Sequence, residues 1–363
     1  VDQVGIAADE HPQLLFGGAG ATLGFQYPAA DLRRAWELLM FNQFHDILAG
    51  SSGHAAMDKA AVQFQELEGT AGAIKFRALR ALVDAVETSS VALQAGLPEG
   101  GLEPVGATIG FGAGNLRVPG SVSTWSHGTP GCEPLVVFNP SPFERSEMAV
   151  TKLWNREYAP ERIAITDDRG QKVAGQVIGE SWYSSHRGVD VLFPTGTLPP
   201  LGYRTFLLHE APEPVAAAGS TMPAANVLQN EHLRVEVDPP SGAVSHLVDL
   251  ASGFDYVPEG ELLGVLELLQ EAPHGMTAWE IGPIVERRVL TEGGIPDDGS
   301  DLRFSRSGDS LGMVQAQRAA LSGPHRAAIR TLHDIGPSRI CLEVTLDAGI
   351  RGEGPEFAGQ PLG

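Results

Sequence analysis

Residues 42–52 of this chain, which read NQFHDILAGSS, decide its fold and give the first indication of its chemistry. The apolar residues before this stretch recur at helical spacing, on one face of a predicted helix: Leu32, Ala35, Trp36, Leu39 and Met40. We expect this helix to begin at an N-cap residue, Asp31, and to end near Phe44. The small residues from Ala49 to Gly53 then predict a turn.

His45 and Asp46 carry the chemistry of this stretch. A neutral imidazole is a common zinc ligand, and a carboxylate accepts strong hydrogen bonds from hydroxyl groups. Taken alone, the pair is more typical of a structural His at a helix C-terminus, where the helix dipole favours a cation, than of a metal ligand. One His cannot form a zinc site, because zinc takes three or four ligands, and the next His, His54, lies beyond the turn.

Residues 42–52 closely resemble the Asn-Gln-Phe-His-Asp-Ile-Leu-Pro-Gly-Ser signature of class II α-mannosidases, glycoside hydrolase family 38, with Ala49 in place of the usual Pro. Further segments resemble that family in the same order: 165–173, 198–205, 230–237 and 278–281. The resemblance implies a retaining glycosidase in which His45 is one ligand of a catalytic zinc ion and Asp46 holds the mannose. It also implies that a second His, two Asp and the nucleophile lie in an N-terminal α/β domain.

Nothing in this chain matches that N-terminal domain. The cluster Asp9-Glu10-His11 is acidic and contains a His, but its order differs from the family's His-x-Asp metal pair. We therefore expect the chain to be part of a longer zinc-dependent α-mannosidase acting on α-mannosides of glycans or small mannosides. It would supply one metal ligand, His45, and one substrate-binding residue, Asp46, but no catalytic nucleophile or acid/base. The isolated chain should be inactive.

Changes of composition along the chain predict an α+β multidomain fold. A second helix is predicted over 54–88, where Gly69 and Gly72 could bend or split it. Alternation over 233–237 and 244–248, around a Pro- and Gly-containing turn, predicts a β-hairpin. The predicted parts are a helical middle domain (1–92), a Gly- and Pro-rich linker (93–132), a small β-sandwich (133–212), a linker (213–225) and a large β-sandwich (226–363). The resemblance implies that the large sandwich is galactose-mutarotase-like, and we expect it to be incomplete.

The composition limits the partners and the location. With a net charge of −20, the chain is a poor fit to nucleic acid or an anionic membrane surface. No apolar run reaches the ~18 residues of a membrane span, and the first residues lack the pattern of a signal peptide. The cysteines, Cys132 and Cys341, fall in different predicted domains, so we expect reduced thiols and a cytoplasmic location.

Other candidate residues could have either a structural or a functional role. Trp279 and Glu280 could face a sugar or belong to a sandwich core, and Trp182-Tyr183 with His186 could form a loop contact between strands. Asp167-Asp168 is typical of a turn rather than of a catalytic pair. The alternative functions are a non-catalytic carbohydrate-binding or scaffolding β-protein, and a hydrolase of a small α-mannoside such as mannosylglycerate.

Overall fold

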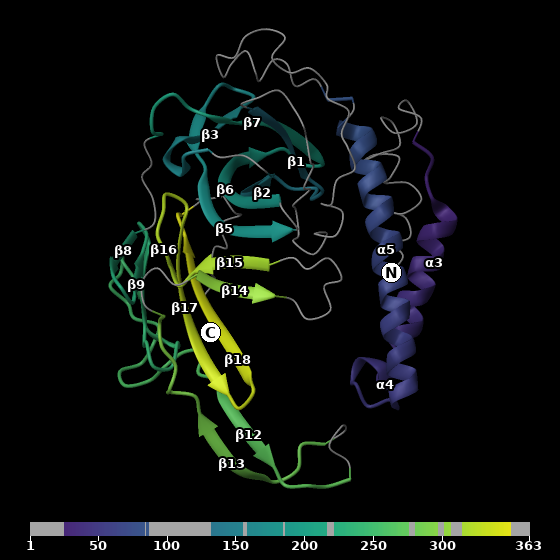
Figure 1. Cartoon of the computed structure of the whole chain (residues 1–363), viewed down its shortest axis with the longest axis vertical. Coiled ribbons are helices and arrows are strands. Elements are labelled where there is room, and N and C mark those ends of the chain that lie inside the picture. The colour runs from purple at the N-terminus through teal and green to yellow at the C-terminus, as the bar shows by residue number, and fades with distance from the viewer. Residues whose placement is uncertain are drawn as a thin grey trace, which may run out of the picture. The chain divides into compact units, whose positions relative to one another are not determined.

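The computed structural model describes residues 25–83, 85–86, 132–154, 158–183, 186–215, 221–275, 280–296, 301–305 and 314–349. It divides into two compact units, one holding the N-terminal helices with Leu269–Arg288 and the other holding the remaining β-strands. Figure 1 labels the helices and strands along the chain. Among the described residues, no helix has the length and apolar character that crossing a membrane requires.

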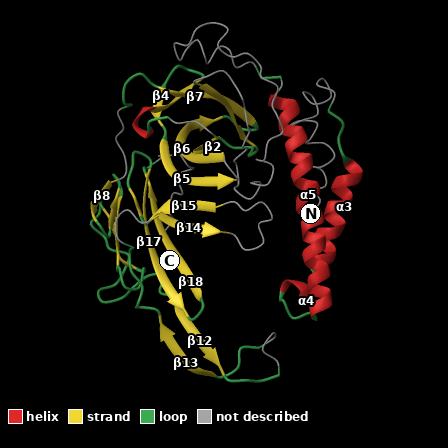
Figure 2. Ribbon diagram, in the orientation of Figure 1, coloured by secondary structure: helices red, strands yellow, loops and turns green. Residues whose placement is uncertain are grey.

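The helical unit contains α3 (Ala29–Asn42), α4 (His45–Leu48) and α5 (His54–Val83), drawn in red in Figure 2. Helices α3 and α5 run antiparallel, since Arg34 near the start of α3 pairs with Glu66 at 3.2 Å and Asp31 pairs with Arg77, further along α5, at 3.6 Å. The prediction of two helices is confirmed, and α5 continues without a break through Gly69 and Gly72.

Two details of the first helix were predicted wrongly. Its N-cap is Pro28, and Asp31 lies in the first turn, because the Leu32 N–H already donates to the Pro28 carbonyl at 3.0 Å. The buried residues of α3 are Ala35, Leu38 and Asn42, while Trp36 and Met40 of the expected core face are 47% and 66% exposed. The buried positions of α5 are both small, Ala60 and Gly72, whereas α3 buries one bulky apolar side chain, Leu38.

The first β-sandwich consists of two sheets. A four-stranded sheet has the order β1 (Cys132–Asn139), β7 (Gly202–Glu210), β3 (Ile163–Asp167) and β4 (Lys172–Ala174), with a 3-10 turn at Pro160–Arg162 before β3. A five-stranded sheet has the order β14 (Asp301–Ser305), β15 (Val314–Arg318), β5 (Gln176–Tyr183), β6 (His186–Leu198) and β2 (Arg145–Trp154). All described pairings are antiparallel, as the turn-separated short runs of the sequence predict.

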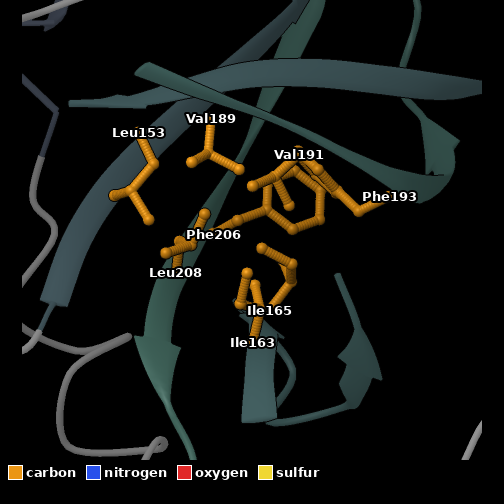
Figure 3. Packing of buried hydrophobic residues seen from close by; sticks show 8 residues of the cluster. All are labelled: Leu153, Ile163, Ile165, Val189, Val191, Phe193, Phe206 and Leu208. Carbon is orange, nitrogen blue, oxygen red and sulfur yellow. The ribbon is translucent and has the colours of Figure 1, made fainter. Parts of the chain in front are cut away.

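The core of this sandwich comes from alternate residues on the inner faces of both sheets (Figure 3). Phe193 on β6 and Phe206 on β7 meet edge to face with ring centroids 5.4 Å apart. The cluster comprises Leu153, Ile163, Ile165, Val189, Val191, Phe193, Phe206 and Leu208.

The C-terminal strands form a second core. One sheet has the order β11 (Val244–Asp249), β10 (Leu233–Val237), β9 (Val227–Gln229) and β8 (Thr221–Ala224), and another has β16 (Ala320–Leu321), β17 (Arg326–Ile335) and β18 (Ser338–Asp347). The predicted hairpin is confirmed, since β10 and β11 pair from Leu233 and Asp249 onwards. The core contains buried apolar residues from both sheets: Leu228, Val235 and Val237 from the first, and Ala327, Ile329 and Leu346 from the second.

Strands β12 (Glu267–Glu271) and β13 (Ile284–Val289) form a separate two-stranded sheet. Before β12, Leu263 makes a single bridge to Val244, and regular pairing begins at Glu267.

The pairing of β15 with β5 connects segments that the sequence assigns to different sandwiches. Val314, Gln315 and Ala316 lie opposite Trp182, Ser181 and Glu180. Strands from the C-terminal part therefore complete a sheet of the first sandwich, and both parts fall in one compact unit. The boundary predicted over 213–225 stays a prediction.

Candidate functional site

The candidate site, His45 and Asp46, lies on the single turn of α4. Helix α3 ends at Asn42, whose buried side chain donates from Nδ2 to the Leu38 carbonyl at 2.9 Å. Phe44 then adopts an extended conformation (φ −58°, ψ 141°) and caps α4. Gly50 follows with φ +72°, a conformation that favours glycine and explains why the chain turns at this position.

Asp46 is held by the turn that follows it. Its backbone carbonyl accepts hydrogen bonds from the N–H groups of Ser51 and Ser52 at 3.0 and 3.1 Å. Its carboxylate oxygen Oδ1 accepts one from Ser51 Oγ at 3.4 Å, and 31% of its side chain is exposed. The short sequence after the pair therefore fixes the backbone of Asp46 while part of its carboxylate remains accessible.

The His45 imidazole is accessible rather than sealed in a core. Its side chain is 67% exposed, and Nε2 lies 3.5 Å from Asp46 Oδ1. Its ring lies 4.2 Å, centroid to centroid, from that of Phe44. An imidazole in this position can offer a nitrogen lone pair to a metal or a hydrogen bond to a ligand.

The described residues do not complete a zinc site. No group of three or more His, Cys, Asp and Glu side chains that could hold a metal occurs in the described part of the chain. Zinc takes three or four protein ligands, and here one imidazole and one adjacent carboxylate come together. The acidic cluster Asp9-Glu10-His11 lies outside the described residues.

The site is surrounded in sequence by exposed apolar side chains that the sequence analysis did not identify. Phe41 and Leu48 are more than half exposed, as are Met40 and Phe44, and Trp36 is nearly so. Helical periodicity had placed Trp36 and Met40 in the core. The available signal was the excess of bulky apolar residues over what one helical face can hold.

The other described candidates are far from His45 and Asp46 in the sequence and do not belong to α4. Trp182 and Tyr183 belong to β5, and Tyr183 pairs with His186 at the start of β6, so the expectation of a loop contact is corrected. Trp279 lies outside the described residues, and Glu280 is exposed without regular structure.

Asp167 and Asp168 form the predicted turn. The Gly170 N–H donates to the Asp167 carbonyl at 3.0 Å, as in a β-turn. The turn also binds Arg204, a contact that the sequence analysis missed.

Comparisons with known proteins relate most of the chain to α-mannosidases. The family model described as "Alpha mannosidase middle domain" matches residues 10–82. The chain is 22% identical over 326 residues to the Homo sapiens protein Alpha-mannosidase 2C1, a match that covers 90% of this chain and 23% of the relative. The Mus musculus protein of the same name is 22% identical over 331 residues, with the same coverage. The chain thus spans less than a quarter of the length of these curated relatives.

Solved structures share the fold. An α-mannosidase from Enterococcus faecalis V583 matches with a TM-score of 0.54 and 14% identity, covering 88% of this chain and 32% of that one. A protein in glycosyl hydrolase family 38 from Enterococcus faecalis matches with a TM-score of 0.55 and 14% identity, covering 94% of this chain and 41% of that one. The chain therefore shares its fold with parts of these two proteins.

Proposed function

We propose that this chain, which is related to the C-terminal portion of the class II α-mannosidases of glycoside hydrolase family 38, is part of a zinc-dependent retaining enzyme that hydrolyses α-mannosides. The observation that carries the proposal is the accessible His45–Asp46 pair on the single turn of α4, within the segment that matches the middle-domain model. A neutral mannoside is also compatible with a surface of net charge −20.

In this proposal each residue of the pair has a separate role. His45 supplies one nitrogen ligand, and polypeptide outside this chain supplies the other metal ligands and the catalytic carboxylates. Bound zinc would act as a Lewis acid near the sugar hydroxyls. Asp46, whose position the Ser51 contacts fix, would accept hydrogen bonds from mannose hydroxyls and so orient the ring.

The proposal is tested in the longer protein, obtained from the reading frame upstream of Val1. Hydrolysis of an aryl α-mannoside and the zinc content by mass spectrometry are measured for the wild type and for His45→Ala. We expect the variant to lose zinc and more than about 100-fold of its activity, since even residues that only support a ligand cost 10–100-fold. His54→Ala is the matched control, because His54 is an exposed His at the start of α5, and it should change neither quantity.

Asp46→Asn separates the two roles. The amide keeps the shape but loses the charge, so kcat/KM should fall about 10- to 100-fold, the value of a hydrogen bond to a charged group, while zinc is retained. An unchanged zinc content in His45→Ala would contradict the metal-ligand role. Robust hydrolysis by the 363-residue chain alone would contradict the need for further polypeptide.

The alternatives predict different results in the same assays. A carbohydrate-binding or scaffolding protein would bind mannosides equally well with and without His45 and would hydrolyse none. A hydrolase of a small α-mannoside such as mannosylglycerate would depend on His45 but would cleave that compound in preference to glycan mannosides. A cytoplasmic location remains part of the proposal, and the free thiol of Cys341 is compatible with it.

A further inference from the structure

The chain passes from one sheet of the first sandwich to the other at a corner formed by Ala174, Gly175 and Gln176. A Cβ at Gly175 would lie 2.5 Å from Ile163 Cγ2 and 2.8 Å from Val191 Cγ1, so the corner needs a glycine to pack against the core. The residues on either side of Gly175 make hydrogen bonds to the beginning of β17.

Gln176 binds the beginning of β17 as a neighbouring strand would. Its Oε1 accepts hydrogen bonds from the N–H groups of His325 and Arg326, both at 2.8 Å, and its Nε2 donates to the Arg326 carbonyl at 2.7 Å. Gln176 is 5% exposed, and a Cβ at Gly323 would lie 2.4 Å from its Cδ, so the amide sits in a closely fitting position. These contacts join segments 150 positions apart in the sequence.

His325 completes the connection. Its Nε2 lies 2.6 Å from the Ala174 carbonyl, and because a carbonyl only accepts, Nε2 must carry the hydrogen. His325 is buried, which lowers its pKa, although the Ala174 carbonyl and Asp347 act in the opposite direction.

Among the described residues, the ring of His325 makes one hydrogen bond, through Nε2. Arg326 and Asp347 already pair with each other through hydrogen bonds of 2.5 and 2.8 Å. From the corner, His325 meets the Ala174 carbonyl and the Gln176 amide, which are both neutral. Protonation would place a new charge in this buried position and would favour an arrangement in which the imidazole reaches water.

We propose that Ala174, Gln176, His325 and Arg326 form an acid-sensitive latch that holds the sandwich corner to β17 while His325 is neutral and opens when His325 is protonated. The direction of this pH dependence follows from the difference in proton affinity between the open and closed forms. Above pH about 6.5 both the closed and the open forms are neutral, and the latch has its full stability. As the pH falls, the open form binds a proton more readily than the closed form, so the open population rises by about tenfold per pH unit until the pKa of the closed form is reached.

Hydrogen exchange of the full chain, read by mass spectrometry at pH 7.5 and 5.5 and corrected for the chemical exchange rate, tests the latch. Peptides covering 172–183 and 323–335 should show opening that increases up to about tenfold between these pH values. His325→Gln keeps an N–H donor for the Ala174 carbonyl but cannot titrate, so it should abolish this increase. His209→Gln is the matched control, since His209 is another buried His with a pKa lowered by burial, and it should leave the increase intact.

A second variant keeps the test decisive if His325→Gln does not fold. Gln176→Met removes the amide, so the same peptides should open at pH 7.5 about as often as those of the wild type do at pH 5.5. The proposal is overturned if the wild type shows no pH-dependent opening at these peptides. It is also overturned if His325→Gln retains the full increase.

Discussion

At the scale of single residues, Arg204 shows how one buried cation organises a turn that the sequence predicts only in outline. Its Nη2 donates to Asp167 Oδ2 and to Asp168 Oδ1, both at 2.5 Å, and its Nη1 donates to the Thr195 carbonyl at 3.0 Å. Burial raises the pKa of Asp167, but hydrogen bonds from Arg204 and from backbone N–H groups outweigh burial and hold that pKa below its ordinary value. The turn is therefore anchored to the centre of the four-stranded sheet.

Removing this cation should be costly. Arg204→Met leaves the Asp167 carboxylate largely buried without its partner, and we expect the free energy of unfolding to fall by about 3–5 kcal/mol. Urea denaturation followed by circular dichroism measures the loss. Arg339→Met is the control, since Arg339 and Asp334 form an exposed pair, and it should leave the midpoint almost unchanged. Equal effects of the two substitutions would show that the burial of Arg204 is unimportant.

At the scale of elements, the contact between α3 and α5 depends on small buried residues. Ala60 is 3% exposed on α5, and Ala35 and Leu38 are the buried apolar residues of α3. Ala60→Leu should therefore force the helices apart and cost about 1–3 kcal/mol, measured as a lower thermal midpoint of the helical signal. Val62→Leu, at an exposed position of the same helix, should have little effect. A tolerated Ala60→Leu would mean that the helices do not pack closely at this position.

The elements also show how far the sequence predicts the fold. The strand that contains 233–237 could be predicted, because an alternation of apolar residues indicates one buried face. The pairing partner of β5 could not, because periodicity tells which face is buried but not which distant strand lies alongside. For Trp36 and Met40 the period was correct and the choice of face was wrong, since helix packing selects small residues as well as apolar ones.

The roles of His45 and Asp46 stay predictions, and the geometry of the pair could not be predicted from the sequence. The motif over 42–52 identified His45 and Asp46, whereas the contacts of Asp46 with Ser51 and the exposure of the imidazole depend on backbone details such as the positive φ of Gly50. The latch at Gln176 and His325 left no sequence signal, because its donors and acceptors are mostly backbone groups.

At the scale of the whole molecule, the strand pairing predicts how the β-rich unit unfolds. Because β15 pairs with β5 and Gln176 binds the start of β17, the two predicted sandwiches share hydrogen bonds. We expect hydrogen exchange in increasing urea to expose peptides from 133–212 and from 320–349 in one common transition. Transitions at clearly different urea concentrations would instead support independent domains divided near 213–225.

The register of β5 also has a consequence for synthesis on the ribosome. Residue 180 emerges long before its strand partner at 316, 136 positions later, which at 5–20 residues per second is a delay of roughly 7–27 s. Throughout that interval, the edge of β5 that later pairs with β15 has backbone N–H and C=O groups without their native partners. A slow stretch of codons between these points would lengthen this exposure, so translation speed bears directly on the yield of correctly assembled protein.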